Sequence, residues 1–96
     1  MAATPVTPQP GLVTEIETGG DAVTVVAGGP NGGFITNPAT ATEPLYINPI
    51  NAAALAANGT TFALAPGQTW DLIPGQTTPT SANALTSGHQ FSAIFY

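Results

Sequence analysis

Glycine and proline divide this chain into short segments and so limit the elements it can form. The 96 residues include 11 glycines and 10 prolines, and both residue types favour turns over the interiors of helices and strands. Between them lie short runs rich in Val, Ile, Thr and aromatic residues, which are typical of strands. We therefore predict an all-β fold, a small sandwich or barrel of about six or seven short antiparallel strands, with a jelly roll among the possibilities.

Two pairs of neighbouring segments are predicted to form hairpins, because each pair flanks a turn sequence. The paired segments are 12–17 with 22–27, and 60–64 with 69–73. The second turn, Ala65–Gln68, has proline and glycine at its central positions, as a type II turn requires. In that hairpin we expect Trp70 to pack over Phe62 and Leu64.

The other segments are assigned from their composition and flanking residues. Strands are expected at 34–36, 45–47 and 90–96, and loops at 28–33 and 78–86. Pro44 and Pro49 enclose the second of these strands, which suits a position at the edge of a sheet. The alanine-rich segment 51–59 is bounded by asparagine and glycine, so a short helix and a loop are equally consistent with it.

The first eleven residues differ in composition from the rest. Pro5, Pro8 and Pro10 stand among Thr and Ala, which favours extended backbone without internal hydrogen bonds. We predict an extended arm at 1–11, suited to lying over a neighbouring molecule, and a single β domain at 12–96. The arm lacks the positive and apolar regions of a secretion signal, so we expect synthesis in the cytoplasm without export.

The chain contains no lysine or arginine, and its formal net charge is −5. Lys and Arg make most phosphate contacts with nucleic acids and attract proteins to anionic membranes. We therefore expect no direct nucleic-acid partner and no membrane association. The acidic residues have almost no cationic partner within the chain and are candidate docking sites for a basic partner: Glu15, Glu17, Asp21, Glu43 and Asp71.

The core of this chain is expected to be thin. Alanine is its most frequent apolar residue and it has no cysteine, so few large side chains and no disulfides stabilise it. Oligomerisation would supply the missing burial, and we expect a homo-oligomer, a trimer or a dimer. The last strand is apolar on both faces, which places it in the centre of a sheet or under another subunit. Its Phe91, Phe95 and Tyr96, with the three arm prolines, are candidate interface residues.

Catalytic and metal-binding residues are scarce. The single histidine, His89, has Ser81, Ser87 and Ser92 nearby in sequence, and Asp21 or Asp71 would complete a triad on paper. Gly88-His89-Gln90 is better explained as a turn before the last strand, so we predict no enzymatic activity. One histidine and no cysteine do not make a zinc site, and no cofactor is expected. The sequence does not exclude calcium sites built from backbone carbonyls.

Aromatic side chains suggest one further kind of site. Tyr46, Trp70 and Tyr96 could line a platform for carbohydrate, because aromatic faces stack on sugars. Three such residues spread over several strands are more often part of a core or an interface. Glycan binding is therefore kept as an alternative.

The C-terminal two-thirds of the chain resembles a known group of phage proteins. The runs EPLYINP, GTTFALAPGQTW, a second PGQT and SGHQFSAIFY are similar to small proteins encoded beside the major capsid genes of tailed bacteriophages. These proteins are regarded as decoration, cement or head-fibre-base components of the virion. The resemblance rests on turns and strands and brings no catalytic residues with it.

The resemblance implies a structural protein on the outside of the virion. Its partner would be the major capsid protein, and its function would be to stabilise contacts between capsomers. Two alternatives remain beside this interpretation. One is a glycan-binding surface module of a phage or bacterium, and the other is a structural component of the phage tail or neck.

Overall fold

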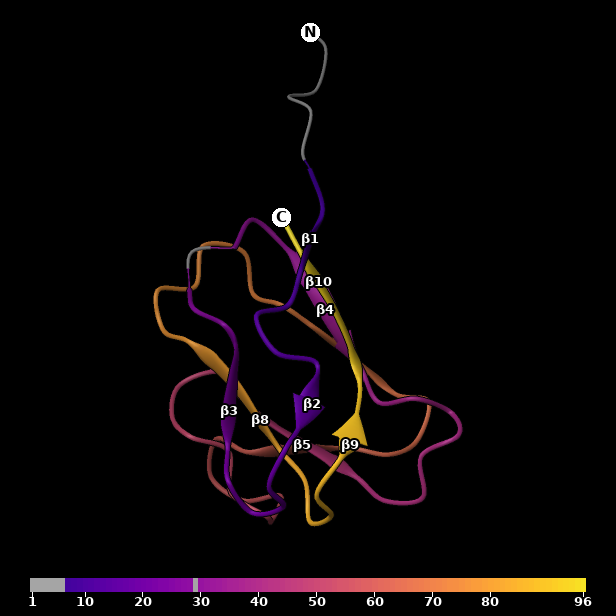
Figure 1. The fold of residues 1–96 in the computed structure, drawn as a ribbon. Coiled ribbons are helices and arrows are strands. Elements are labelled where there is room, and N and C mark those ends of the chain that lie inside the picture. The colour runs from indigo at the N-terminus through magenta and orange to yellow at the C-terminus, as the bar shows by residue number, and fades with distance from the viewer. Residues whose placement is uncertain (1–6, 29) are drawn as a thin grey trace, which may run out of the picture.

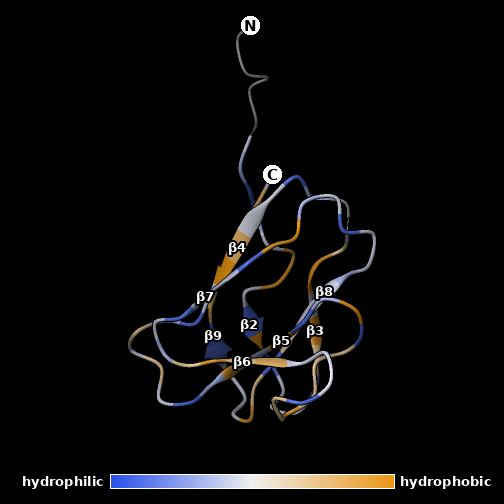
Figure 2. Ribbon diagram, turned by 180° about the vertical axis from the view of Figure 1, so that it is seen from behind, coloured by the Kyte–Doolittle hydropathy of each residue, from blue (hydrophilic) through white to orange (hydrophobic). Residues whose placement is uncertain are grey.

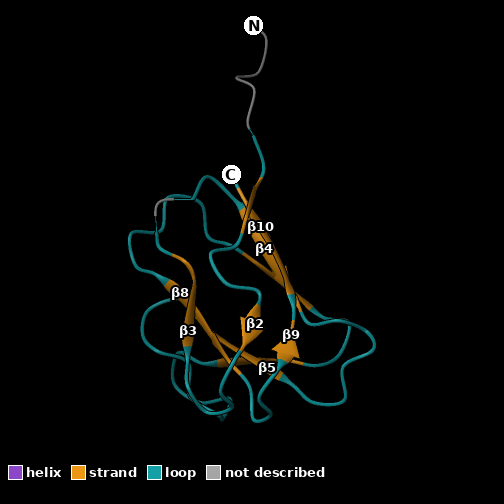
Figure 3. Ribbon diagram, in the orientation of Figure 1, coloured by secondary structure: helices purple, strands orange, loops and turns teal. Residues whose placement is uncertain are grey.

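The computed structural model describes residues 7–28 and 30–96. Within them the chain is all-β, as predicted, and forms ten short antiparallel strands in three sheets joined by loops (Figure 3). The strands are β1 (Gln9–Pro10), β2 (Glu15–Ile16), β3 (Val23–Val26), β4 (Gly33–Thr36), β5 (Leu45–Asn48), β6 (Phe62–Leu64), β7 (Thr69–Asp71), β8 (Thr80–Asn83), β9 (His89–Gln90) and β10 (Ser92–Phe95). Their number exceeds the prediction because β1 and β8 were not expected and the last expected strand is divided into β9 and β10.

Two four-stranded sheets and one two-stranded ribbon contribute to a common core, in the manner of a small sandwich. We name the larger sheets by a central strand: the β10 sheet has the order β1-β10-β4-β7, and the β8 sheet has the order β3-β8-β5-β6. The ribbon pairs β2 with β9. Figure 1 shows β10 and β4 on one side of the molecule and β3 and β8 on the other. The core takes Ile35 from the β10 sheet, Val25 and Ile47 from the β8 sheet, and Ile16 from the ribbon, all fully buried.

Both predicted hairpins are wrong, although their turns form. Strand β2 pairs with β9 and β3 with β8, while β6 pairs with β5 and β7 with β4 (Figure 2). The amide of Asp21 donates to the carbonyl of Thr18 at 3.0 Å, and the amide of Gln68 donates to that of Ala65 at 2.9 Å. Each turn therefore carries the chain from one sheet to another. A turn sequence specifies a reversal, whereas pairing depends on which sheet buries the apolar face of the strand.

The expected contact between Trp70 and Phe62 is present even though their strands do not pair. Their ring centroids lie 4.8 Å apart, with the ring planes tilted by 34°. Because β6 belongs to the β8 sheet and β7 to the β10 sheet, this stack joins the two sheets. The right pair of side chains was thus inferred from the wrong pairing of strands.

Strand β5 is central in its sheet, which corrects the prediction of an edge strand. It lies between β8 and β6 and pairs with both. Pro44 and Pro49 stand just outside the strand, so every residue within Leu45–Asn48 keeps its N–H group. Proline excludes a central position only when it occupies a position that must donate to a neighbouring strand.

Strand β8 lies where a loop was predicted. All four of its residues are buried, although three of them are polar. The hydroxyl of Ser81 accepts the amide of Ala53 at 2.6 Å, and the side-chain amide of Asn83 donates to the carbonyl of Ala53 at 2.9 Å. The segment 51–59 is accordingly a loop anchored on β8, and no part of it is helical. These polar side chains of β8 form hydrogen bonds to this loop. The strand therefore lacks the alternation of apolar and polar residues by which a strand is recognised from its sequence.

The last strand is central, one of the two positions predicted for it. Strand β10 lies between β4 and β1. The residues that pair with it in β1, Gln9 and Pro10, fall within the segment expected to be an arm, so the sheet extends into that segment. Of the arm prolines, Pro8 and Pro10 are exposed, and Pro5 lies outside the described residues.

Candidate functional site

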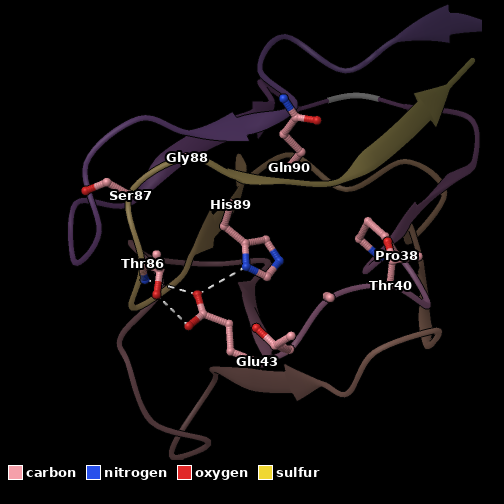
Figure 4. Close-up of a pocket in the computed structure, with 10 residues that line it drawn as sticks. Pro38, Thr40, Glu43, Thr86, Ser87, Gly88, His89 and Gln90 are labelled. Atoms are coloured by element: carbon pink, nitrogen blue, oxygen red, sulfur yellow. Dashed lines mark hydrogen bonds and ion pairs between the residues drawn. The ribbon is translucent and has the colours of Figure 1, made fainter.

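Four polar residues gather beside a shallow depression at one end of the molecule. We call them the His89 cluster: Asn37, Glu43, Thr86 and His89. Figure 4 shows Glu43, Thr86 and His89 beside the depression. The depression has a volume of about 360 Å³ and is lined by residues from the segments 38–43 and 86–90. Strand β9 carries His89, and the loop between β4 and β5 carries Asn37 and Glu43. The cluster thus connects parts of the chain that are far apart in sequence.

The imidazole of His89 lies between two hydrogen-bond acceptors. Its Nδ1 is 3.1 Å from Oε1 of Glu43, and its Nε2 is 2.8 Å from Oδ1 of Asn37. The side chain of His89 is only 6% exposed. Both ring nitrogens are therefore engaged within the protein.

The amide of Asn37 is held in one orientation. Its Nδ2 donates to the carbonyl oxygens of Glu43 at 3.0 Å and Leu64 at 2.9 Å. Reversing the amide would place its oxygen against those two carbonyls, so this hydrogen-bond network assigns Oδ1 to the side of His89. With an ionised Glu43 on its other side, His89 faces an acceptor at each nitrogen.

Glu43 has several partners, which corrects the expectation that all the acids lack internal partners. One carboxylate oxygen accepts the hydroxyl of Thr86 at 2.8 Å, and the other accepts the amide of Thr86 at 3.0 Å. The hydroxyl of Thr86 lowers the pKa of Glu43; partial burial opposes this shift, and the Thr86 amide and His89 add to it. The carboxylate is thereby held in its charged form.

The His89 cluster is arranged to hold loops together rather than to activate a nucleophile. The hydroxyl of Thr86 donates to Glu43, and the hydroxyl of Ser87 accepts the amide of Gly19 at 2.9 Å. Among the described residues, no hydrogen bond joins His89 to Ser81, Ser87 or Ser92, nor to Asp21 or Asp71. The triad that the sequence allows on paper is not assembled. A general base must lie within hydrogen-bond reach of the proton it takes, and both nitrogens of this ring are occupied.

The other acids stand apart from the His89 cluster. Glu15 lies on β2, and Glu17 and Asp21 follow it in exposed positions. Asp71 is exposed on β7, at the edge of the β10 sheet. In the described part of the chain, no three His, Asp or Glu side chains come together in a group that could hold a metal ion.

The candidate interface residues at the end of the chain divide between core and surface. Phe91 is 5% exposed and belongs to the core, so it offers no surface to a partner. Phe95 packs partly against the same core. Tyr96 is 40% exposed. Of these three side chains, Tyr96 presents the most area to a second molecule.

The aromatic residues considered for carbohydrate binding lie on different strands. Tyr46 is half-buried on β5, and Trp70 is half-buried on β7. The indole N–H of Trp70 is buried and has no hydrogen-bond partner within the described residues. Its neighbour Phe62 is 46% exposed. The aromatic pair that reaches the surface is thus Phe62 and Trp70, and Phe62 was not among the residues considered for carbohydrate binding.

The outward side of the β10 sheet is a candidate surface that the sequence analysis did not identify. One row of paired residues crosses all four strands: Pro10, Ile94, Phe34 and Asp71. Residues directly opposite in antiparallel strands share a face, and each of these four is exposed. In the sequence, Phe34 and Ile35 are adjacent apolar residues of one strand, so they lie on opposite faces of its sheet. The sequence does not say which residues of neighbouring strands share the face of Phe34, so it could not reveal this surface.

Comparisons with known proteins identify no relative. No family model matches the chain, and neither a curated protein nor a solved structure matches it. No helix in the described residues is long and apolar enough to cross a membrane. Evidence on function therefore comes from the residues and their arrangement.

Proposed function

We propose that this protein is a structural component of a phage virion that binds the outer surface of the capsid and stabilises contacts between capsomers. The observation that carries the proposal is the exposed apolar row on the outward side of the β10 sheet, where Phe34 and Ile94 are each 39% exposed. A row of this kind on a small domain is typical of a surface that meets another protein. The phage-like runs described above support the same class of function.

The His89 cluster supports a structural function over a catalytic one. Its one imidazole is engaged by Glu43 and Asn37 and is nearly buried. The groups that usually take part in acid–base chemistry are here used to hold two loops and a strand. A decoration protein needs a rigid scaffold rather than a reactive group.

Binding to the assembled shell would stabilise it by mass action. A ligand that binds the folded or assembled state and not the dissociated one adds its binding free energy to the stability of the former. At a free concentration of 100 times its dissociation constant, this amounts to about 2.7 kcal/mol for each site. Many equivalent sites on one capsid would make the total large.

The test is the composition and stability of purified particles. The protein should be present in a fixed ratio to the major capsid protein, and particles that lack it should melt at a lower temperature. Adding the purified chain back should restore the melting temperature. Absence from particles, or an unchanged melting temperature without the chain, contradicts the proposal.

We also predict that the free protein is a homo-oligomer, a trimer or a dimer. Light scattering during gel filtration measures its oligomeric state.

Glycan binding is the second candidate function, and the pair of Phe62 and Trp70 favours it. The ring of Phe62 is 46% exposed and lies against the half-buried ring of Trp70, so part of this aromatic pair is open to stack on a sugar. Saturable binding on a glycan array, lost in Phe62→Ala and Trp70→Phe, would favour recognition of a host surface. If the folded protein binds no glycan, this candidate is eliminated.

The other alternative is a structural component of the tail or neck. A cryo-EM map of the particle shows whether the protein lies on the head, the tail or the neck.

A further inference from the structure

The outward side of the β10 sheet has the composition of an interface. We call it the outer face and define it by residues that share one side of the four strands: Pro10, Ile94, Phe34, Asp71, Ser92, Thr36 and Thr69. The first row crosses the sheet from Pro10 through Ile94 and Phe34 to Asp71. Three of its four members are apolar and exposed. Such a row lies open on a sheet whose opposite side is already packed against the core.

A second row of the outer face is made of hydroxyl groups. Ser92 is opposite Thr36, and Thr36 is opposite Thr69. The hydroxyl oxygens of Thr36 and Thr69 lie 2.9 Å apart in an exposed hydrogen bond, which shows that the two side chains lie on the same side of the sheet. An apolar centre beside a polar margin is the usual arrangement of a protein–protein interface.

Apolar side chains extend the outer face beyond the paired residues. Tyr96 continues the alternation of Ile94 along β10, and its amide donates to the carbonyl of Gly32 at 3.1 Å. Ile73 continues the alternation of Asp71 beyond β7. These two side chains are 40% and 50% exposed. The apolar surface is therefore broader than the single row of the sheet.

Charge decides which occupant fits the outer face. Asp71 is the one charged side chain of its two rows, and the chain has no lysine or arginine to place opposite it. The single histidine is engaged by Glu43. A second copy would bring another Asp71 to the contact together with its own net charge of −5. Like charges across an interface oppose binding, whereas a cationic group opposite Asp71 favours it.

We propose that the outer face docks on a partner protein whose surface is apolar opposite Phe34 and Ile94 and carries a lysine or arginine opposite Asp71. This inference rests on the proposed function, in which that partner is the capsid shell. A second copy of this chain does not meet the charge requirement. Because the pair at Asp71 lies at the edge of the sheet, raising the ionic strength should weaken the binding.

The experiment measures binding of purified variants to particles that lack the protein. Phe34→Thr and Ile94→Thr each remove apolar area while keeping a residue suited to strands, and Asp71→Asn removes the charge. Leu85→Thr and Asn58→Ala are the controls, because Leu85 is 69% exposed and Asn58 is exposed, and both lie off the outer face. Thermal melting of each free variant verifies that it is folded.

Phe34→Thr and Ile94→Thr should each bind about 10-fold more weakly or worse. Asp71→Asn should bind about 2- to 5-fold more weakly and lose the dependence on ionic strength. The two controls should bind like the wild type. The inference is overturned if the wild type binds and the outer-face variants bind equally well. It is also overturned if Phe34→Thr dissociates a homo-oligomer of the free protein, since the face would then meet a second copy. Failure of the wild type to bind any particle overturns the proposed function, and this inference with it.

Discussion

Nδ1 of His89 lies 3.1 Å from Oε1 of Glu43, across 46 positions of sequence. The pair joins the single histidine of the chain to a loop that precedes β5, so the final part of the chain is tied to its middle. Asn37 completes the arrangement from the other side of the ring. Because the chain has no lysine or arginine, His89 is its one side chain that can carry a positive charge near neutral pH. The pair and Asn37 together hold strand β9 against the loop between β4 and β5.

Acid should destabilise the protein through Glu43. Its folded-state pKa is lowered, chiefly by the hydroxyl of Thr86. A lowered pKa contributes stability that is present above the unfolded-state value, near 4.5, and is lost as the pH falls through the folded-state value. The melting temperature should therefore fall as the pH is lowered from 6 to 3, and Glu43→Gln should reduce that fall. Asn58→Ala, an exposed substitution that changes no charge, is the control and should leave the pH profile of the wild type in place. Equal profiles for Glu43→Gln and wild type would contradict the prediction.

Replacing Asn37 with alanine should cause a large loss of stability. The side chain is fully buried, donates to the carbonyls of Glu43 and Leu64, and accepts from His89. Its removal leaves these partners buried without hydrogen bonds, so we expect a loss of about 3 kcal/mol in the free energy of unfolding. Urea denaturation measures this loss. Asn58→Ala, at an exposed position, should change it by less than about 0.5 kcal/mol, and a similar loss in both variants would show that Asn37 has no special role.

A methyl group at Gly33 should disrupt the pairing of β4 with β10. Gly33 has a φ of 134°, and a Cβ there would overlap the carbonyl oxygen of Ile94. Gly75 has a φ of 76° and open space around it, so Gly75→Ala isolates the cost of backbone conformation alone. We expect about 1 kcal/mol for Gly75→Ala and more than about 3 kcal/mol for Gly33→Ala. Comparable thermal melting of the two variants would mean that the close approach of β10 is not needed.

Ser81→Ala should loosen the loop anchored on β8. The hydroxyl of Ser81 accepts the amide of Ala53 at 2.6 Å in a buried position, and its loss leaves that amide without an acceptor. We expect a cost of about 1–2 kcal/mol and faster hydrogen exchange at the Ala53 amide. Ser92→Ala, exposed on β10, is the matched control. Unchanged exchange at Ala53 in Ser81→Ala would refute the anchoring role.

The strands that could be recognised from sequence are those with a local pattern. Val23–Val26 and Phe34–Thr36 are short β-branched or aromatic runs next to turn residues, and both are strands. Strand β8 could not be recognised, because its Thr, Ser and Asn side chains resemble those of a loop. Their partners at Ala53 and Gly20 lie 28 to 63 positions away. A polar residue is suited to a buried strand only when such partners exist, and sequence spacing does not reveal them.

The candidate sites show the same limit. His89 and Glu43 were both noticed as residues, one as an isolated histidine and the other as an acid without an internal partner. Their pairing depends on β9 lying near the loop before β5, which is a property of the whole fold. The outer face likewise depends on β1, β10, β4 and β7 being neighbours. Phe34 and Ile94 share a face only because their strands pair in one register.

The sequence by itself determined that this protein is a β-structure built from short strands, that the chain turns at Thr18–Asp21 and Ala65–Gln68, and that no lysine or arginine is available to pair with its acids. Those properties follow from backbone preferences and composition, which act over a few residues. The tertiary structure alone decided that both turns lead to another sheet, that β5, β8 and β10 are central, and that Glu43 holds His89. These arrangements are favoured because they bury apolar side chains and pair hydrogen-bonding groups that are distant in sequence. A local sequence pattern contains no information about which distant groups will be paired.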